Sequence, residues 1–144
     1  MANRMVLHRA VILNLSRRDA SRFLGRVMTE AEALARLYAA TGEYTTGNLS
    51  RSIHKDGPHI RPGAVTGRVG SRLHHAALAE RGARPHLIFP HPPRRYLKFF
   101  WRRAGRTVYL DKVRHPGYRG KRYLERALRE VALRHGMRVV EIPI

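Results

Sequence analysis

The sequence predicts an α+β fold, with a long N-terminal helix and a C-terminal helix packed on a small, mostly antiparallel sheet. Two amphipathic helical patterns, over residues 16–40 and 121–136, and several short strand-like segments between them support this prediction. With 144 residues, the chain is expected to form a single α+β domain over 1–144, in which 1–15 is an N-terminal segment.

The first predicted helix covers residues 16–40. Ser16 stands three residues before Asp19, as an N-cap does, and the charged side of the helix is expected to be a solvated face. Gly42 and Gly47 follow as helix breakers. The apolar residues at helical spacing are Phe23, Val27, Ala31, Leu34 and Tyr38.

Short elements are predicted next. Alternation over 49–53 indicates a strand, and the prolines and glycine of 54–62 indicate an exposed, flexible loop. Residues 63–71 resemble a short strand. The alanine-rich stretch 72–85 then predicts a brief helix or tight turn that ends at Gly82.

A hairpin over residues 96–113 is the clearest strand prediction, with its turn at Ala104-Gly105. The preceding segment 84–95 is rich in proline and is predicted as a flexible loop or edge segment. Strand alternation places three residues of the hairpin on a buried side, opposite Val108 and Leu110. These three are Leu97, Phe99 and Trp101.

The last elements are a helix over residues 121–136 and a strand over 137–144. Gly136 is expected to end the helix at its C′ position, and Pro143 restricts the strand to a sheet edge. The apolar face of the helix contains Leu124, Ala127, Leu128 and Val131.

Charge is the most unusual property of the composition. The chain has 29 Lys and Arg against 10 Asp and Glu, a formal net charge of +19. Such an excess favours an anionic partner, which is a nucleic acid, a membrane surface or an acidic protein. Most of the excess is arginine, which is typical of folded surfaces and interfaces, although a GC-rich genome also explains it in part.

Two function classes are disfavoured by composition. The absence of cysteine excludes disulfides, thiolate zinc sites and cysteine nucleophiles. No apolar run approaches the roughly 18 residues of a transmembrane helix, and arginines interrupt the apolar N-terminal stretch. We therefore expect a soluble, unprocessed protein without a membrane partner.

Catalytic motifs are not found in the sequence. Adjacent His74 and His75 point apart in either a strand or a helix, so a metal-dependent nuclease that used them with Glu80 is disfavoured. The remaining carboxylates are too scattered for a paired acid and base. The chain is expected not to be an enzyme and to need no metal or cofactor. The interleaved aromatic and cationic residues of "YLKFFWRR" leave a nucleic-acid-binding domain as an alternative.

Four stretches, in order, resemble a known family. They are "TTGNLSRSI" (45–53), "GRVGSRLHHAALAERGARPH" (67–86), "GRTVYLDKVRHPGYRGKRYL" (105–124) and "LERALREV" (124–131). Together they are similar to the small head-tail joining, or tail-completion, proteins of long-tailed bacteriophages. "GEYTTG" stands where the family often has a proline-aspartate before its threonine-glycine.

The resemblance implies a structural virion protein at the phage neck or the head-proximal tail end, which joins or completes the tail. Its subunits are expected to form a homo-oligomeric ring, a hexamer, in contact with connector, stopper or tail-tube proteins. Genomic DNA would pass through the lumen, and the ring would assemble in the host cytoplasm. The resemblance carries over no catalytic residue.

Within this family assignment, the segment "KVRHPGYRGKRYLERAL" (112–128) becomes the candidate assembly site. Pro116 and Gly117 force a turn, which His115 is expected to brace with a hydrogen bond. Gly47 and Gly82 are expected to make turns elsewhere. The candidate contacts with an acidic subunit are Arg94, Arg95, Arg114, His115, Arg119, Lys121 and Arg122.

Overall fold

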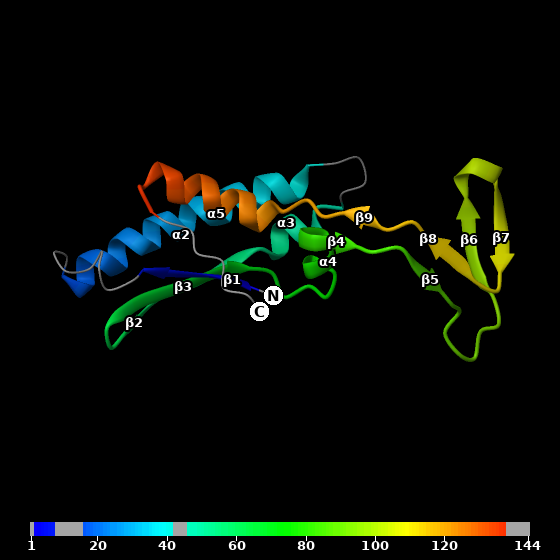
Figure 1. Ribbon diagram of the computed structural model, residues 1–144, viewed down its shortest axis with the longest axis horizontal. Coiled ribbons are helices and arrows are strands. Elements are labelled where there is room, and N and C mark those ends of the chain that lie inside the picture. The colour runs from blue at the N-terminus through cyan, green and yellow to red at the C-terminus, as the bar shows by residue number, and fades with distance from the viewer. Residues whose placement is uncertain (1, 8–15, 42–45, 138–144) are drawn as a thin grey trace. The chain divides into compact units, whose positions relative to one another are not determined.

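The computed structural model describes residues 2–7, 16–41 and 46–137, and it confirms the α+β class (Figure 1). Contacts group the chain into two compact units. Unit 1 comprises Met1–Arg81 and Lys121–Ile144, and unit 2 comprises Gly82–Gly120, which we call the insert. The prediction of one domain over 1–144 is not tested by this grouping and stays a prediction.

Helix α2 (Arg17–Ala40) is the predicted long helix and lies at the centre of unit 1. Of its five predicted apolar positions, Val27 and Ala31 are buried, while Phe23, Leu34 and Tyr38 pack at the edge of the core and are partly buried. The Ser16 side chain caps it by accepting a hydrogen bond from the Asp19 N–H at 3.2 Å. In Figure 1, α2 runs beside α5 (Tyr123–Arg134) and over the sheet. The buried residues of α2 are Ala20, Leu24, Val27, Met28, Ala31, Ala35 and Ala39.

Helix α5 packs its apolar stripe against α2. The predicted face of α5 is buried in full, and Gly136 follows the helix with a positive φ of 63°. Polar contacts also join the two helices. The Tyr38 hydroxyl donates to Glu130, and the Arg126 guanidinium lies 4.3 Å from the centre of the Tyr38 ring.

The sheet of unit 1 has the order β1-β3-β2, with antiparallel neighbours. β1 (Ala2–Leu7) lies in the predicted N-terminal segment, and β3 (Ala64–Gly70) confirms the predicted strand over 63–71. Gly67 of β3 faces α2 so closely that a Cβ there would lie 2.1 Å from the Met28 sulfur. A glycine at this position therefore permits the close approach of helix and sheet.

The loop predicted over 54–62 is instead a strand, β2 (His54–Arg61), so that prediction was wrong. Its pairing with β3 shifts register between Asp56 and His59, and Gly57 has a φ of 103°. This bulge contains Gly57 and Pro58, the residues that favoured a loop, because a bulged position tolerates a residue without a paired N–H.

The strand predicted over 49–53 is also wrong, because Asn48–Ser52 form the short helix α3. Gly47 precedes it with a φ of 73°, as a turn position requires. Tertiary contacts fix the segment: Ser50 donates to the Arg36 carbonyl, and the Arg36 guanidinium donates twice to the Ile53 carbonyl, at 3.0 and 2.8 Å.

Helix α4 (Ala76–Arg81) ends unit 1 before the insert, and Gly82 follows it as predicted. Where the chain returns to unit 1, the Lys121 N–H donates to the Ala79 carbonyl at 2.8 Å. The Arg122 N–H donates to the Glu80 carbonyl at 3.1 Å. The chain therefore leaves and re-enters unit 1 at neighbouring points.

The insert is a succession of three antiparallel strand pairs. β4 (Gly82–Ala83) pairs with β9 (Tyr118–Arg119), and β5 (His86–Ile88) pairs with β8 (Val113–His115). β5 places a short strand inside the predicted loop 84–95.

The predicted hairpin is the third strand pair of the insert. It comprises β6 (Leu97–Trp101), a 3₁₀ turn η1 (Arg102–Ala104) and β7 (Arg106–Leu110). The strand predicted over 137–144 lies outside the described residues, apart from Met137.

Replacement of the insert by a short Gly-Ser linker between Arg81 and Lys121 should leave unit 1 folded. Every buried residue of the described chain lies in unit 1, and its two ends already meet through backbone hydrogen bonds. Thermal unfolding followed by circular dichroism should remain a single cooperative transition. Loss of cooperativity in the shortened chain would contradict the division into units.

Tyr38→Phe should raise the pH at which acid unfolds the protein. The hydrogen bond from Tyr38 lowers the pKa of Glu130 below its ordinary 4.5, with Arg134 and Arg126 contributing. The folded state then binds fewer protons than the unfolded state, so this stabilisation is full above pH 4.5 and is lost as the pH falls through the lowered pKa. Acid titration of both proteins measures the midpoint, and identical midpoints would contradict the role of Tyr38.

Candidate assembly surface

The His115-Pro116-Gly117 corner joins β8 to β9 and is a braced turn. The Gly117 N–H donates to His115 Nδ1 at 3.0 Å, which confirms the expected hydrogen bond. Gly117 has a φ of 80°, and a Cβ there would lie 2.4 Å from the Ala83 carbonyl oxygen. Only glycine fits this position, so the corner depends on the residues that the sequence singled out.

The ring of His115 also stacks on the ring of His86 in the paired strand. The two centroids are 5.1 Å apart with an interplanar angle of 22°, and His86 Nδ1 donates to the Arg84 carbonyl at 2.8 Å. The rings thus join β5 to β8 where the ladder pairs His86 with His115. These contacts give His115 a structural role in the insert.

Two residues beside the corner act inside unit 1. The Lys121 ammonium donates to the carbonyls of Ala39 and Thr41, at 3.3 and 2.5 Å, and so caps the C-terminal end of α2. Arg122 is the residue before the first turn of α5, with a left-handed φ of 50°, and it pairs with Glu125 at 3.4 Å. Of the predicted assembly contacts, Lys121 is therefore already engaged in the fold.

Glu80 supplies the cap that α5 lacks in its own sequence. Its carboxylate oxygens accept hydrogen bonds from the N–H groups of Leu124 and Glu125, each at 2.9 Å. The neighbouring Tyr123 is fully buried, and its hydroxyl donates to the Ala76 carbonyl at 3.4 Å. Burial, together with the charge of Glu80, raises the pKa of Tyr123 to about 12.

The use of Glu80 as a cap leaves the nuclease hypothesis without its carboxylate. His74 and His75 are exposed, and within the described residues no three metal-binding side chains lie close enough to hold an ion. No helix in that part of the chain is long and apolar enough to cross a membrane.

The remaining predicted contacts are exposed arginines of the insert. For the side chains of Arg94, Arg95, Arg114 and Arg119, the structure records no ion pair with any described residue. The insert as a whole carries ten Lys and Arg and one carboxylate, Asp111. Its net formal charge of +9 makes it the more densely charged unit.

The side of the hairpin that was predicted to be buried is not buried. Phe99 and Trp101 were predicted to be buried, yet they are 37% and 48% exposed, and no residue of the insert is buried. Alternation predicted correctly which residues share a face, but a two-stranded ribbon has no second layer to cover it.

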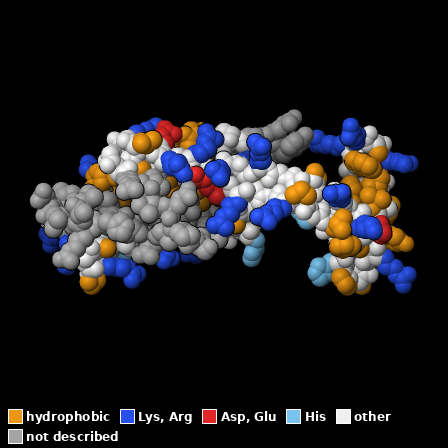
Figure 2. Space-filling model, in the orientation of Figure 1, with side chains coloured by type: hydrophobic (Ala, Val, Ile, Leu, Met, Phe, Trp, Pro, Cys, Tyr) orange, Lys and Arg blue, Asp and Glu red, His pale blue; other side chains and the backbone are white. Residues whose placement is uncertain are grey.

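Strand pairing defines two faces on this ribbon. One, which we call the apolar face, contains Leu97, Phe99, Trp101, Val108 and Leu110, because Leu97 pairs with Leu110 and Phe99 with Val108. The opposite face carries Phe100 and Tyr109, which are 62% and 60% exposed, and Lys98 lies 5.6 Å from the centre of the Tyr109 ring. Figure 2 shows hydrophobic side chains over β6 and β7 with Lys and Arg around them.

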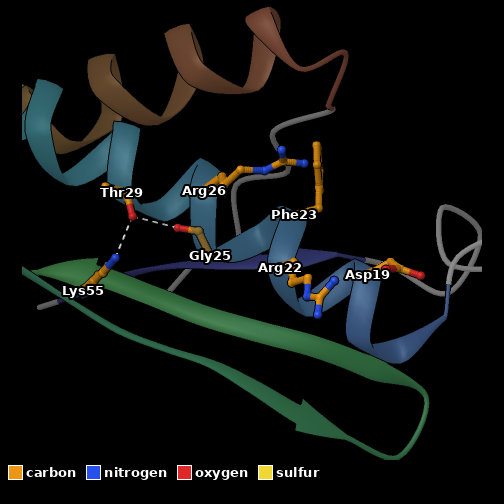
Figure 3. Close-up of a pocket in the computed structure, with 7 residues that line it drawn as sticks. All are labelled: Asp19, Arg22, Phe23, Gly25, Arg26, Thr29 and Lys55. Carbon is orange, nitrogen blue, oxygen red and sulfur yellow. Dashed lines mark hydrogen bonds between the residues drawn. The ribbon is translucent and has the colours of Figure 1, made fainter.

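A shallow groove in unit 1 lies between α2 and β2 (Figure 3). The Lys55 ammonium donates to the Thr29 hydroxyl at 2.6 Å, and that hydroxyl donates to the Gly25 carbonyl at 2.9 Å. The groove contains a single carboxylate, that of Asp19, and so offers no acid and base pair. Its lining residues are Asp19, Arg22, Phe23, Gly25, Arg26, Thr29 and Lys55.

Sequence reasoning missed the internal roles of Lys121 and Glu80. Both side chains act across more than 40 positions, from residues that no local motif marks. Comparisons of the chain with protein families, characterised proteins and solved structures found no match.

Glu80→Gln should destabilise the protein by about 1–2 kcal/mol, because an amide accepts only one of the two hydrogen bonds and carries no charge for the helix dipole. Urea denaturation measures the change in the free energy of unfolding. Glu125→Gln is the matched control, since Glu125 forms only i,i+3 and i,i+4 ion pairs with exposed arginines, at roughly 0.3 kcal/mol each, and its loss should stay below about 1 kcal/mol. Equal losses for both variants would contradict the capping role.

Proposed function

We propose that this protein is a structural virion protein that forms a ring at the phage neck or the head-proximal tail end. The ring, a hexamer, joins the tail to the head or completes the tail, and it has no catalytic role. The family resemblance of the four sequence stretches motivates the proposal, and the insert supplies its physical support.

One observation carries the proposal: the apolar face of the hairpin leaves Phe99 and Trp101 exposed and its other residues partly exposed, and the insert has no buried residue. A two-stranded ribbon is marginally stable in water by itself, and exposed apolar patches mark sites of protein association. A subunit that works only within a larger assembly is expected to leave such a face uncovered until it is assembled.

The distribution of charge agrees with this role. Arginine remains charged when partly desolvated and pairs with carboxylates through its planar fork, so it is enriched at interfaces. The exposed arginines of the insert are therefore assigned to contact with acidic neighbouring subunits. A strongly cationic lumen would instead retain the DNA that passes through it.

A basic nucleic-acid-binding domain is the second candidate function. The observation that favours it is the face of the ribbon on which Phe100 and Tyr109 are exposed near Lys98, because bases stack on aromatic rings beside cations. In this case the free protein would bind DNA tightly, with a steep dependence on salt.

Purified phage particles should contain the protein at a fixed copy number, about six per particle for a single hexameric ring. Quantitative mass spectrometry against the major capsid protein measures this number.

Arg114→Glu with Arg119→Glu should leave the circular dichroism spectrum unchanged and reduce joining, whereas Arg72→Glu, at an exposed arginine of unit 1, serves as the control. Absence from particles, together with tight, salt-sensitive DNA binding by a monomer, would favour the second candidate.

A further inference from the structure

We propose that the apolar face of the hairpin docks into an apolar groove, rimmed by carboxylates, on a different protein of the particle. The partner is an acidic protein, not a second copy of this chain and not a nucleic acid. The inference rests on the proposed function, because it takes the partner to be a neighbouring virion subunit.

The first step concerns the chemistry of the face. Leu97, Val108 and Leu110 contribute aliphatic surface, to which Phe99 and Trp101 add partly exposed rings. Burial of aliphatic side chains against other apolar side chains lowers the free energy, whereas nucleic-acid bases bind by stacking on aromatic rings. This mixture therefore fits a protein groove better than a strand of nucleic acid.

The second step concerns the ends of the face. Arg106 pairs with Trp101 and so lies at one end of the face, while Lys112 follows Leu110 and Asp111 in the chain just beyond the other end of β7. Arg103, in the turn of the hairpin, adds a third exposed cation. A groove that accepts this ribbon needs carboxylates around its rim for electrostatic complementarity.

The third step excludes a second copy as the partner. The insert has a net formal charge of +9, and the rest of the chain carries 19 Lys and Arg against nine Asp and Glu. Docking of the insert on another copy would bring together two units of net positive charge, which opposes this contact more strongly than contacts between copies that leave the insert out. A carboxylate-rich protein reverses the sign of this interaction.

Zero-length carbodiimide cross-linking of intact particles tests the assignment, because it joins a lysine amine directly to a carboxylate. Lys98 and Lys112 are the only lysines of the insert, while Lys55 and Lys121 donate hydrogen bonds within unit 1. Lys112 should be joined to an Asp or Glu of a different virion protein. Lys112→Arg is the matched control, since it retains the charge, removes the reactive amine and should abolish that cross-link without loss of joining.

Joining assays with particles that lack this protein test which face docks. Addition of purified Trp101→Ser should require at least about tenfold more protein for half-maximal joining, because truncated aromatic anchors commonly lose this much affinity. Phe100→Ser, on the opposite face of the same strand, should raise the amount of protein needed for half-maximal joining by less than half as much.

Three results would overturn the inference while the proposed function survives. They are a Lys112 cross-link to a carboxylate of another copy of this chain, a nuclease-sensitive association of the insert with DNA, and a larger joining defect for Phe100→Ser than for Trp101→Ser. Absence of the protein from particles would overturn the proposed function itself and the inference with it.

Discussion

The hydrogen bonds from the start of helix α5 to the Glu80 carboxylate are the interaction on which the packing of unit 1 depends. Helix α5 supplies one side of the core, yet it begins only after the insert, and the side chain of its N-cap residue, Arg122, forms no capping hydrogen bond. Glu80 closes this gap by accepting the first free N–H groups of α5, while the Lys121 ammonium caps the end of α2. These contacts keep α5 packed in the core of unit 1, although the insert separates it from α4 in the chain.

The two long helices could be predicted from the sequence because apolar residues recur every three to four positions along each of them. This spacing places the apolar residues on one side of a helix. Short elements were less predictable, since tertiary contacts override weak local patterns. α3 replaced a predicted strand where Arg36 and Ser50 bind backbone groups of another segment. β2 replaced a predicted loop because its bulge accommodates Gly57 and Pro58.

The candidate site was predictable where its geometry is local and unpredictable where it is not. The turn at Pro116-Gly117 and the hydrogen bond of His115 follow from residues that are adjacent in the chain. The engagement of Lys121 depends on the end of a helix 80 positions away. Alternation assigned Phe99 and Trp101 to one face, but no local pattern states whether another layer covers that face, and in the described residues none does.

The position of α5 has a further consequence for how the chain folds during synthesis. Tyr38 and Glu130 are 92 positions apart, and Glu30 bonds to His135 across 105 positions. The ribosome therefore releases α2 long before its partner helix exists, and the apolar stripe of α2 has only the sheet to cover it in that interval. Non-local closure of this kind slows folding and exposes nascent chains to aggregation.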